Sequence, residues 1–265
     1  MRVSAAQRWR EHLAAWRIPD HILRQAPRSP WIHPVERFRV GDGPIPDAPS
    51  HRLAREVLDA GATVLDIGCG GGRAALALAP PATRVYGVDH QESMLDAFAE
   101  AAERRGLRHH AVLGDWPAVA DDALIADVAV AHHVAYNVAD LATFARVAAA
   151  HARRRVVLEL SERHPLTPMA PLWRHFWGLD RPLGPTADDA LAVLREAGIP
   201  ALITRWEEEG ERRDDLPLAA RVEFTRIRLC LPAARDAELA EVLAGQPPAP
   251  PRTVAAIWWD VAAAG

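Results

Sequence analysis

An apolar run that ends in an acid and then breaks into glycines occupies residues 64–73, with the sequence VLDIGCGGGR. A short apolar run without alternation predicts a strand that is buried on both faces, and the glycines predict a tight turn after it. Residues 74–79 are strong helix formers, and two prolines end that stretch. Glycines let the backbone approach a ligand, and the free N–H groups at a helix start carry partial positive charge. We therefore expect a cofactor site whose backbone is provided by Gly68, Gly70 and Gly72.

Apolar runs typical of strands continue to alternate with helical stretches along the rest of the chain. The runs predicted to be strands lie at residues 83–89, 109–113, 126–131, 155–160, 201–206 and 254–261. Such alternation predicts an α/β fold with a doubly wound, mostly parallel sheet and right-handed crossovers. Ligands of such sheets bind outside the carboxyl ends of the strands, and the glycine turn follows one of these ends.

The 265 residues are long for one domain and short for two, so we expect one main domain with added segments. Residues 1–50 predict a cap on this domain, built of an amphipathic helix and a coil punctuated by prolines. The main domain is expected over residues 51–265, with two insertions. Residues 161–185, rich in proline and aromatic residues, predict a lid, and residues 218–244 predict a helical insertion.

Acidic residues end or follow three consecutive predicted strands, at Asp66, Asp89 and Asp115. Three acids around a glycine turn suit a ligand with cationic groups and a ribose diol, whereas they would repel a pyrophosphate. A dinucleotide fingerprint needs Gly-x-Gly-x-x-Gly or a terminal Ala. Counted from Gly68 this fingerprint fails, but counted from Gly70 it is complete. A nicotinamide-dependent oxidoreductase that binds NAD therefore stays an alternative.

With these residues, the sequence resembles the class I S-adenosylmethionine-dependent methyltransferases over about residues 50–206 and the last strand. The resemblance implies a Rossmann-like, seven-stranded sheet whose last strand is antiparallel, with S-adenosylmethionine as cofactor and S-adenosylhomocysteine as product. It implies that Asp66 lies near the methionine moiety, that Asp89 holds the ribose hydroxyls and that Asp115 accepts from the adenine amino group. The cofactor-binding residues expected from the resemblance are Asp66, Gly68, Gly70, Gly72, Asp89, His90, Met94, Gly114, Asp115, Trp116 and His132.

Met94 or Trp116 would pack on the adenine ring in that arrangement. Alternatively, Trp116 could be an ordinary core residue, and the acids could merely cap turns. The recurrence of acids after consecutive strands favours the cofactor site.

The predicted strand 126–131 runs into His132 and His133, where the family places residues that face the transferred methyl. A histidine there could take the proton of a substrate hydroxyl, because imidazole titrates near neutrality. The expected catalytic residues are His132, His133 and Tyr136, and Asn137 is expected to orient the substrate. The alternative is that one histidine packs against the sheet and the other bonds a backbone carbonyl. No cluster with metal-ligand spacing appears, so no metal is expected.

Aromatic and ionisable side chains gather in two irregular segments, which predict a pocket for an organic acceptor above the cofactor. The expected substrate residues are Trp31, His33, Phe38, Asn137, His164, Trp173, His175 and Trp177. The alternative is a structural lid whose tryptophans anchor it to the core.

The formal net charge of −4, with acids and bases interspersed, predicts a small-molecule substrate and no nucleic-acid or membrane partner. Two cysteines cannot form a disulfide framework, and no run has the length of a membrane span. We expect a cytoplasmic protein. The helical segment 218–244 could support a homodimer, or it could complete the core of one chain.

These observations together predict methyl transfer from S-adenosylmethionine to a small molecule. The expected reaction is O-methylation, with N-methylation as the second choice. No Asn/Asp-Pro-Pro-Tyr-like amine signature follows the fourth strand, which argues against methylation of bases or of protein glutamine. Two alternatives come from other classes: an NAD-dependent oxidoreductase, and a non-catalytic domain that binds S-adenosylmethionine.

Overall fold

The computed structural model describes residues 3–208, 217–247 and 250–262. One seven-stranded sheet has the order β3-β2-β1-β4-β5-β7-β6. Its strands are β1 (Thr63–Ile67), β2 (Arg84–Asp89), β3 (Arg108–Leu113), β4 (Ala126–His132), β5 (Ala152–Ser161), β6 (Leu202–Glu208) and β7 (Arg252–Asp260). The first five strands pair in parallel, and β7 pairs antiparallel with both β5 and β6. The predicted Rossmann-like sheet with an antiparallel last strand is confirmed.

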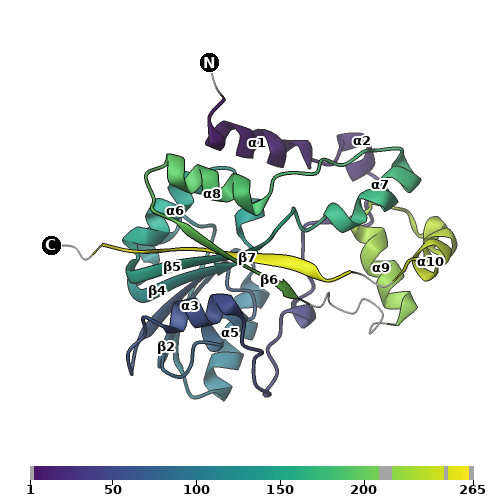
Figure 1. Cartoon of the computed structure of the whole chain (residues 1–265). Coiled ribbons are helices and arrows are strands. Elements are labelled where there is room, and N and C mark those ends of the chain that lie inside the picture. The colour runs from purple at the N-terminus through teal and green to yellow at the C-terminus, as the bar shows by residue number, and fades with distance from the viewer. Residues whose placement is uncertain (1–2, 209–216, 248–249, 263–265) are drawn as a thin grey trace.

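Helices cover both faces of the sheet and also form a group beside it (Figure 1). One face packs against α1 (Ala5–Ala15), α6 (Leu141–Ala150) and α8 (Ala187–Glu196). The other face packs against α3 (Pro49–Arg55), α4 (Arg73–Leu76) and α5 (Glu92–Arg104). Beside the sheet lie α2 (Asp20–Leu23), α7 (Ala170–Trp177), α9 (Leu218–Arg228) and α10 (Asp236–Ala244), which share a third apolar cluster. Short 3-10 turns are η1 (Val35–Arg37), η2 (Ala120–Asp122), η3 (Ala135–Asn137), η4 (Thr167–Met169) and η6 (Ala233–Arg235).

The strand β5 begins three residues before the predicted start, and the helix predicted at 74–79 is the single turn α4. The exposed charges of Arg153 and Arg154 hid this start in the sequence, whereas Arg155, the first residue of the predicted strand, is buried. Arg155 is 7% exposed because its guanidinium donates to Asp260 Oδ1 at 2.7 Å and to the carbonyl of Leu53 at 2.7 Å. The charge of Arg155 is therefore neutralised by partners on β7 and α3, which composition alone does not reveal.

The helix α1 of the predicted cap packs into the main core. Trp9 has no exposed surface, and its indole N–H donates to the carbonyl of Val138 at 2.8 Å. Its ring stacks on Tyr136 with centroids 5.6 Å apart. The N-terminal segment thus supports the chain that follows β4, and the boundary at residue 50 stays a prediction.

The predicted lid and the predicted helical insertion pack on each other. Their helices α7, α9 and α10 share the third cluster, in which Trp173, Leu229 and Leu239 are buried. Both helices expected over residues 218–244 are present as α9 and α10. This packing completes the core of one chain, which was one of the two roles considered for the insertion.

Candidate functional site

The turn after β1 holds three glycines in left-handed backbone conformations. The φ angles are 69° at Gly68, 50° at Gly70 and 88° at Gly72, which other residues rarely adopt. A Cβ at Gly68 would also lie 2.5 Å from Cγ2 of Val134, and a Cβ at Gly72 would lie 2.6 Å from a ring carbon of Phe98. Backbone conformation and close packing therefore both require glycine here.

Two acids lie at this turn. Asp66 is 1% exposed, and its Oδ2 accepts from the N–H of Ala75 at 3.0 Å. Burial and, to a smaller extent, the charge of Asp89 together raise the pKa of Asp66 to about 7, although the hydrogen bond from Ala75 opposes this shift. Asp89 accepts from the N–H groups of Gly70 at 2.9 Å and Gln91 at 3.0 Å. A cation bound between the two carboxyl groups would relieve their repulsion.

The remaining expected cofactor residues surround this turn with different exposures. Met94 is buried on α5, whereas His90 is exposed with Nδ1 3.6 Å from Oδ1 of Asp89. Asp115 is exposed after Gly114, where a Cβ would overlap a neighbouring valine side chain. Asp115 is therefore open to a ligand, as its predicted role requires.

Trp116, expected to stack on adenine, lies against the helix α6. Its indole N–H donates to the carbonyl of Phe144 on α6 at 3.4 Å, and its ring meets His151 edge-on with centroids 5.1 Å apart. Trp116 packs against the core cluster on the α6 face of the sheet. Trp116 is thus anchored on the core, in line with the alternative role, but it is half-buried, so its stacking on adenine stays a prediction.

Residues 30–41, which we call the strap, cross the glycine turn. A Cβ at Gly71 would overlap the carbonyl oxygen of Phe38, and a Cβ at Gly70 would lie 3.3 Å from the ring of Phe38. Arg228 on α9 holds the strap by donating to Nδ1 of His33 at 2.8 Å. The structure therefore brings His33 and Phe38 to the predicted cofactor site.

Burial and the charge of Arg228 lower the pKa of His33 to about 4, so His33 is neutral at pH 7. A hydrogen bond of 3.2 Å from the side chain of Gln91 to the carbonyl of His33 ties the strap to the end of β2. Trp31, the third residue expected from this coil, is 49% exposed.

Side chains from three elements meet around Glu159 on β5. In the register, His132 lies opposite Glu159 and Asp66 lies opposite Val130. Because side chains alternate along strands, Asp66, His132 and Glu159 point to the same face of the sheet. The α3 helix packs on that face and adds Ser50.

The contacts around Glu159 use both of its oxygens. Its Oε1 lies 3.1 Å from Nε2 of His133, and its Oε2 lies 3.6 Å from Nδ1 of His132. Ser50 Oγ donates to Oε2 of Glu159. The ring of His51 stacks on that of His132 with centroids 5.4 Å apart. We call these five residues the Glu159 cluster.

Burial separates the protonation states of this cluster. It lowers the pKa of His132 to about 4, against the charge of Glu159, so His132 is neutral at pH 7. Burial opposes ionisation of Glu159, but His132, the hydrogen bond from His133 and that from Ser50 hold the pKa of Glu159 below its usual range. The positive charge of Arg73 on α4 also lowers the pKa of His132.

His133 is the exposed member of the cluster, with 45% of its side chain accessible. Its φ angle of 61° is left-handed, and its backbone N–H donates to the carbonyl of Glu159 at 2.7 Å. Val134, the next residue, touches Gly68. His133 therefore directly precedes the residue that contacts Gly68, the first glycine of the turn.

The catalytic role predicted for Tyr136 also needs correction. Its hydroxyl donates to the carbonyl of Ser161 at 2.7 Å, and its ring is covered by Trp9. Burial raises the pKa of Tyr136 above its ordinary value, so the phenol keeps its proton. Tyr136 therefore anchors the chain after β4, whereas Asn137 beside it is exposed.

Three expected substrate residues serve instead to hold the lid. Trp173 is 1% exposed, and the indole N–H of Trp177 donates to the carbonyl of Leu229 at 2.7 Å. His175 pairs with Glu238 of α10 at 3.1 Å. His164 is buried and stacked on Trp16 with centroids 4.1 Å apart. His164 and Trp173 are buried and Trp177 is tied to Leu229, so these three residues anchor the lid, whereas His175 is exposed in its pair with Glu238 and its substrate role stays a prediction.

The sequence did not point to Ser50 or His51, and it offered Glu159 only as one of the ionisable groups that could line the pocket, without a partner. A lone glutamate inside the apolar strand VVLEL was the available signal, because a buried charge needs partners. Its partner Ser50 is 109 residues away along the chain, so only folding reveals the pair.

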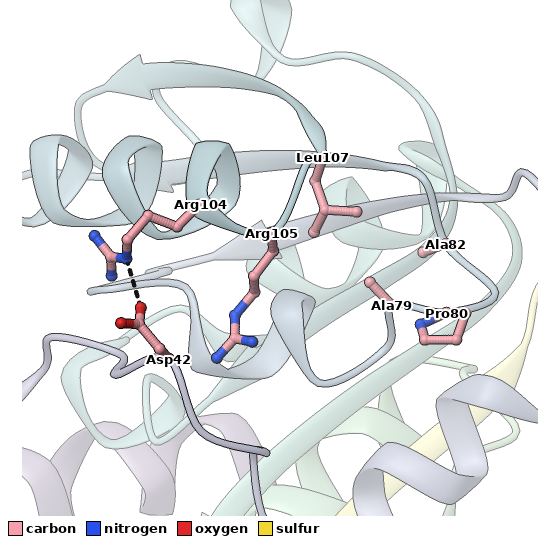
Figure 2. A pocket seen from close by; sticks show the side chains of 7 residues that line it. All are labelled: Asp42, Ala79, Pro80, Ala82, Arg104, Arg105 and Leu107. Atoms are coloured by element: carbon pink, nitrogen blue, oxygen red, sulfur yellow. Dashed lines mark hydrogen bonds and ion pairs between the residues drawn. The ribbon is translucent and has the colours of Figure 1, made fainter.

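A cavity of about 530 Å³ lies elsewhere, between residues 79–82, Leu107 and the end of α5 (Figure 2). These segments precede β2 and β3, so the cavity is at the amino ends of the strands. Arg104 there is paired with Asp42 at 3.0 Å. Among the residues that the structure describes, no group of three or more His, Cys, Asp or Glu could hold a metal ion.

Comparison with known proteins points to one family of domains. Residues 64–155 match the family model described as a methyltransferase domain. These residues run from the glycine turn through β4 into β5. Over these residues the chain matches a methyltransferase domain, and its sheet has the Rossmann-like order described above.

Two relatives of the methyltransferase domain are informative. The chain is 34% identical over 171 residues to an uncharacterized protein of Haemophilus influenzae, a match that covers 61% of this chain and 61% of that protein. The chain therefore spans about three-fifths of the length of this curated relative. The crystal structure of the YcgJ protein from Bacillus subtilis matches with a TM-score of 0.53 and 17% identity, covering 82% of this chain and 99% of that one. That likeness shows the fold.

Proposed function

We propose that this chain transfers a methyl group from S-adenosylmethionine to a small-molecule acceptor, with an oxygen atom as the acceptor atom. The observation that carries the proposal is the pair of carboxyl groups, Asp66 and Asp89, at a turn of left-handed glycines. The methyltransferase domain assigned to residues 64–155 supports it.

The chemistry of these residues fits the donor. Burial is the main cause of the raised pKa of Asp66, and a sulfonium or ammonium group beside it would stabilise its ionised form. Asp89 would accept from the ribose hydroxyls, and the exposed Asp115 from the adenine amino group. Gly68 and Gly70 would let the backbone approach the methionine moiety. When bound, the donor supplies an electrophilic methyl on sulfur.

The strap would exclude water from the donor. Phe38 already packs on the glycine turn, and Arg228 fastens the strap to α9. Excluding water and holding the acceptor in line with the methyl are the main contributions that a protein makes to such a displacement.

Two experiments separate this proposal from the NAD-dependent oxidoreductase and from the non-catalytic domain that binds S-adenosylmethionine. Isothermal calorimetry with S-adenosylmethionine, S-adenosylhomocysteine and NAD should show binding of the first two only. Binding of NAD alone would favour the oxidoreductase. Incubation with tritiated S-adenosylmethionine and a bacterial metabolite extract should then label a small molecule, whereas binding without transfer would favour a non-catalytic domain.

Asp89→Asn is expected to bind S-adenosylmethionine about 10- to 100-fold more weakly, since hydrogen bonds to a charged acceptor are worth about 1.5–3 kcal/mol. The amide has one acceptor oxygen, so it keeps the hydrogen bond from the N–H of Gly70 or that from Gln91, which bind different oxygens of Asp89, and it cannot accept both ribose hydroxyls. Calorimetry measures the affinity. Asp121→Asn, at an exposed acid of η2, is the matched control and should bind normally. Normal binding by Asp89→Asn would overturn the ribose assignment.

Location and assembly remain proposals. No helix within the described ranges is long and apolar enough to cross a membrane. Both cysteines are buried and free. We propose a cytoplasmic protein without nucleic-acid or membrane partners, and the homodimer considered for the α9–α10 insertion stays a prediction.

A further inference from the structure

We propose that His133 is the base that takes the proton of a hydroxyl acceptor during methyl transfer, and that Glu159 positions it. This inference rests on the proposed methyl transfer and specifies its acceptor class and its base. The notable feature is that one residue, Glu159, holds His133 at two points. Its carbonyl accepts from the backbone N–H of His133 at 2.7 Å, and its carboxylate lies 3.1 Å from Nε2 of the same residue.

The two-point attachment selects one nitrogen of His133. With Nε2 facing a carboxylate, the proton of the neutral imidazole stays on Nε2. Nδ1 then carries the lone pair, and no hydrogen bond to it is found among the described residues. The side chain is 45% accessible, so Nδ1 can be reached by a substrate.

His132 is unsuited to the same role. Its Nδ1 faces Glu159, its ring stacks on His51, and only 13% of its side chain is accessible. Its other nitrogen, Nε2, is buried and has no hydrogen-bond partner among the described residues. His132 therefore acts as a neutral packing element between α3 and Glu159.

The backbone of His133 supports a functional role. A φ of 61° is uncommon for a residue with a Cβ and costs free energy unless the surrounding structure stabilises it. Here it directs the imidazole out of the sheet, next to Val134, which touches Gly68 of the turn. His133 thus contacts the buried carboxylate of Glu159 and lies one residue from the contact with the glycine turn.

The proposed reaction is a displacement at the methyl carbon of the donor. A lone pair of the acceptor oxygen forms the new O–C bond, and the electrons of the S–C bond return to sulfur, which leaves as a neutral thioether. The hydroxyl proton passes to Nδ1 of His133 and later to water. The charge of Glu159 stabilises the imidazolium that forms, as a carboxylate does for a histidine base. A neutral hydroxyl is the acceptor that needs this help, because a neutral amine can attack first and lose its proton afterwards.

Tritiated S-adenosylmethionine tests the base with a panel of simple phenols, a matched panel of anilines and the metabolite extract. His133→Asn keeps a residue that tolerates left-handed backbone while removing the imidazole. We expect label in the phenols or in hydroxyl compounds of the extract, and a kcat that falls about 100-fold or more in His133→Asn. Calorimetric affinity for the donor should be unchanged. Added imidazole should restore part of the turnover of His133→Gly.

His110→Gln, at an exposed histidine of the edge strand β3, is the matched control and should turn over normally. Transfer by His133→Asn at the wild-type rate, or transfer to anilines alone, would overturn the inference while leaving the proposed function intact. Donor binding without transfer to any panel or to the extract by the wild-type chain would overturn both.

Glu159→Gln tests the positioning role through the pH profile. This variant leaves in place the other titratable members of the cluster, His132 and His51, and the charged groups that act on them, which are Asp47, Arg55 and Arg73. Without the carboxylate, the imidazolium is less stable, so the acidic limb of kcat should move to lower pH while the plateau falls. Ser50→Ala should cause a smaller change in the same direction and is the second variant should Glu159→Gln fail to fold. A lower plateau with an unmoved limb in both variants would mean that Glu159 is only structural.

Discussion

Asp66→Asn is expected to unfold at a higher temperature than the wild-type chain at pH 8 and to bind S-adenosylmethionine more weakly. Burial raises the pKa of Asp66 from 3.8 to about 7, so keeping it ionised in the folded chain at pH 8 costs free energy. The amide of asparagine can still accept from the N–H of Ala75. A pKa difference of about 3 units sets an upper limit of about 4 kcal/mol for the stabilisation.

The pH dependence of this effect has a definite sign. Between pH 3.8 and about 7 the folded chain holds the proton of Asp66 while the unfolded chain releases it. Stability contributed by this group is therefore present at low pH and is lost as the pH rises through about 7. Thermal unfolding should show Asp66→Asn close to wild type at pH 4 and above it at pH 8. Equal differences at both pH values would contradict the raised pKa.

A loss of donor affinity in Asp66→Asn would explain why the chain has a buried carboxyl group at this position although it lowers the stability of the fold at pH 8. Calorimetry should find weaker binding of S-adenosylmethionine, because the cation loses one of the two carboxyl groups at the turn. Asp121→Asn again serves as the control and should change neither stability nor binding. A stable variant that also binds normally would leave Asp66 without a role in the site.

Trp9→Ala is expected to lower the free energy of unfolding by about 3–5 kcal/mol, the usual cost of removing a fully buried aromatic side chain. Trp9 has no exposed surface and donates to the carbonyl of Val138 at 2.8 Å. Its loss also uncovers Tyr136, so the chain that follows His133 should loosen and turnover should fall. Urea unfolding and the tritium assay measure the two effects.

Trp9→Phe is the matched variant, because it keeps a stacking ring and removes only the indole N–H. It should cost about 1–3 kcal/mol, the price of an unsatisfied buried carbonyl. If Trp9→Ala were no less stable than Trp9→Phe, α1 would be a dispensable cap. That outcome would contradict the packing of α1 into the main core.

Much of the fold could be predicted because period and composition carry local information. Apolar runs without alternation gave seven strands, and their carboxyl ends had to meet at one edge of a parallel sheet. Asp66 and Asp89 could be paired in this way before any coordinates. The start of β5 was missed because Arg153 and Arg154 are charged and exposed, so that no apolar run marks it.

Aromatic residues were the main source of error in the site. Trp116, Tyr136, Trp173 and Trp177 have the same sequence signature whether they bind a ligand or fill a core. The indole N–H groups of Trp116 and Trp177 and the hydroxyl of Tyr136 each donate to a backbone carbonyl, and no local sequence pattern identifies that partner. His33 and Phe38, predicted by the same reasoning, do reach the glycine turn.

The sequence by itself determined the sheet, the glycine turn and the acids beside it, because each of these depends on neighbours along the chain or on the common direction of parallel strands. Only the tertiary structure decided which histidine is accessible and what supports it. Ser50, His133 and Glu159 come from α3, from the end of β4 and from β5, and Ser50 lies 109 residues from Glu159. Their meeting depends on sheet register and helix packing, which act over distances that no local pattern in a single sequence records.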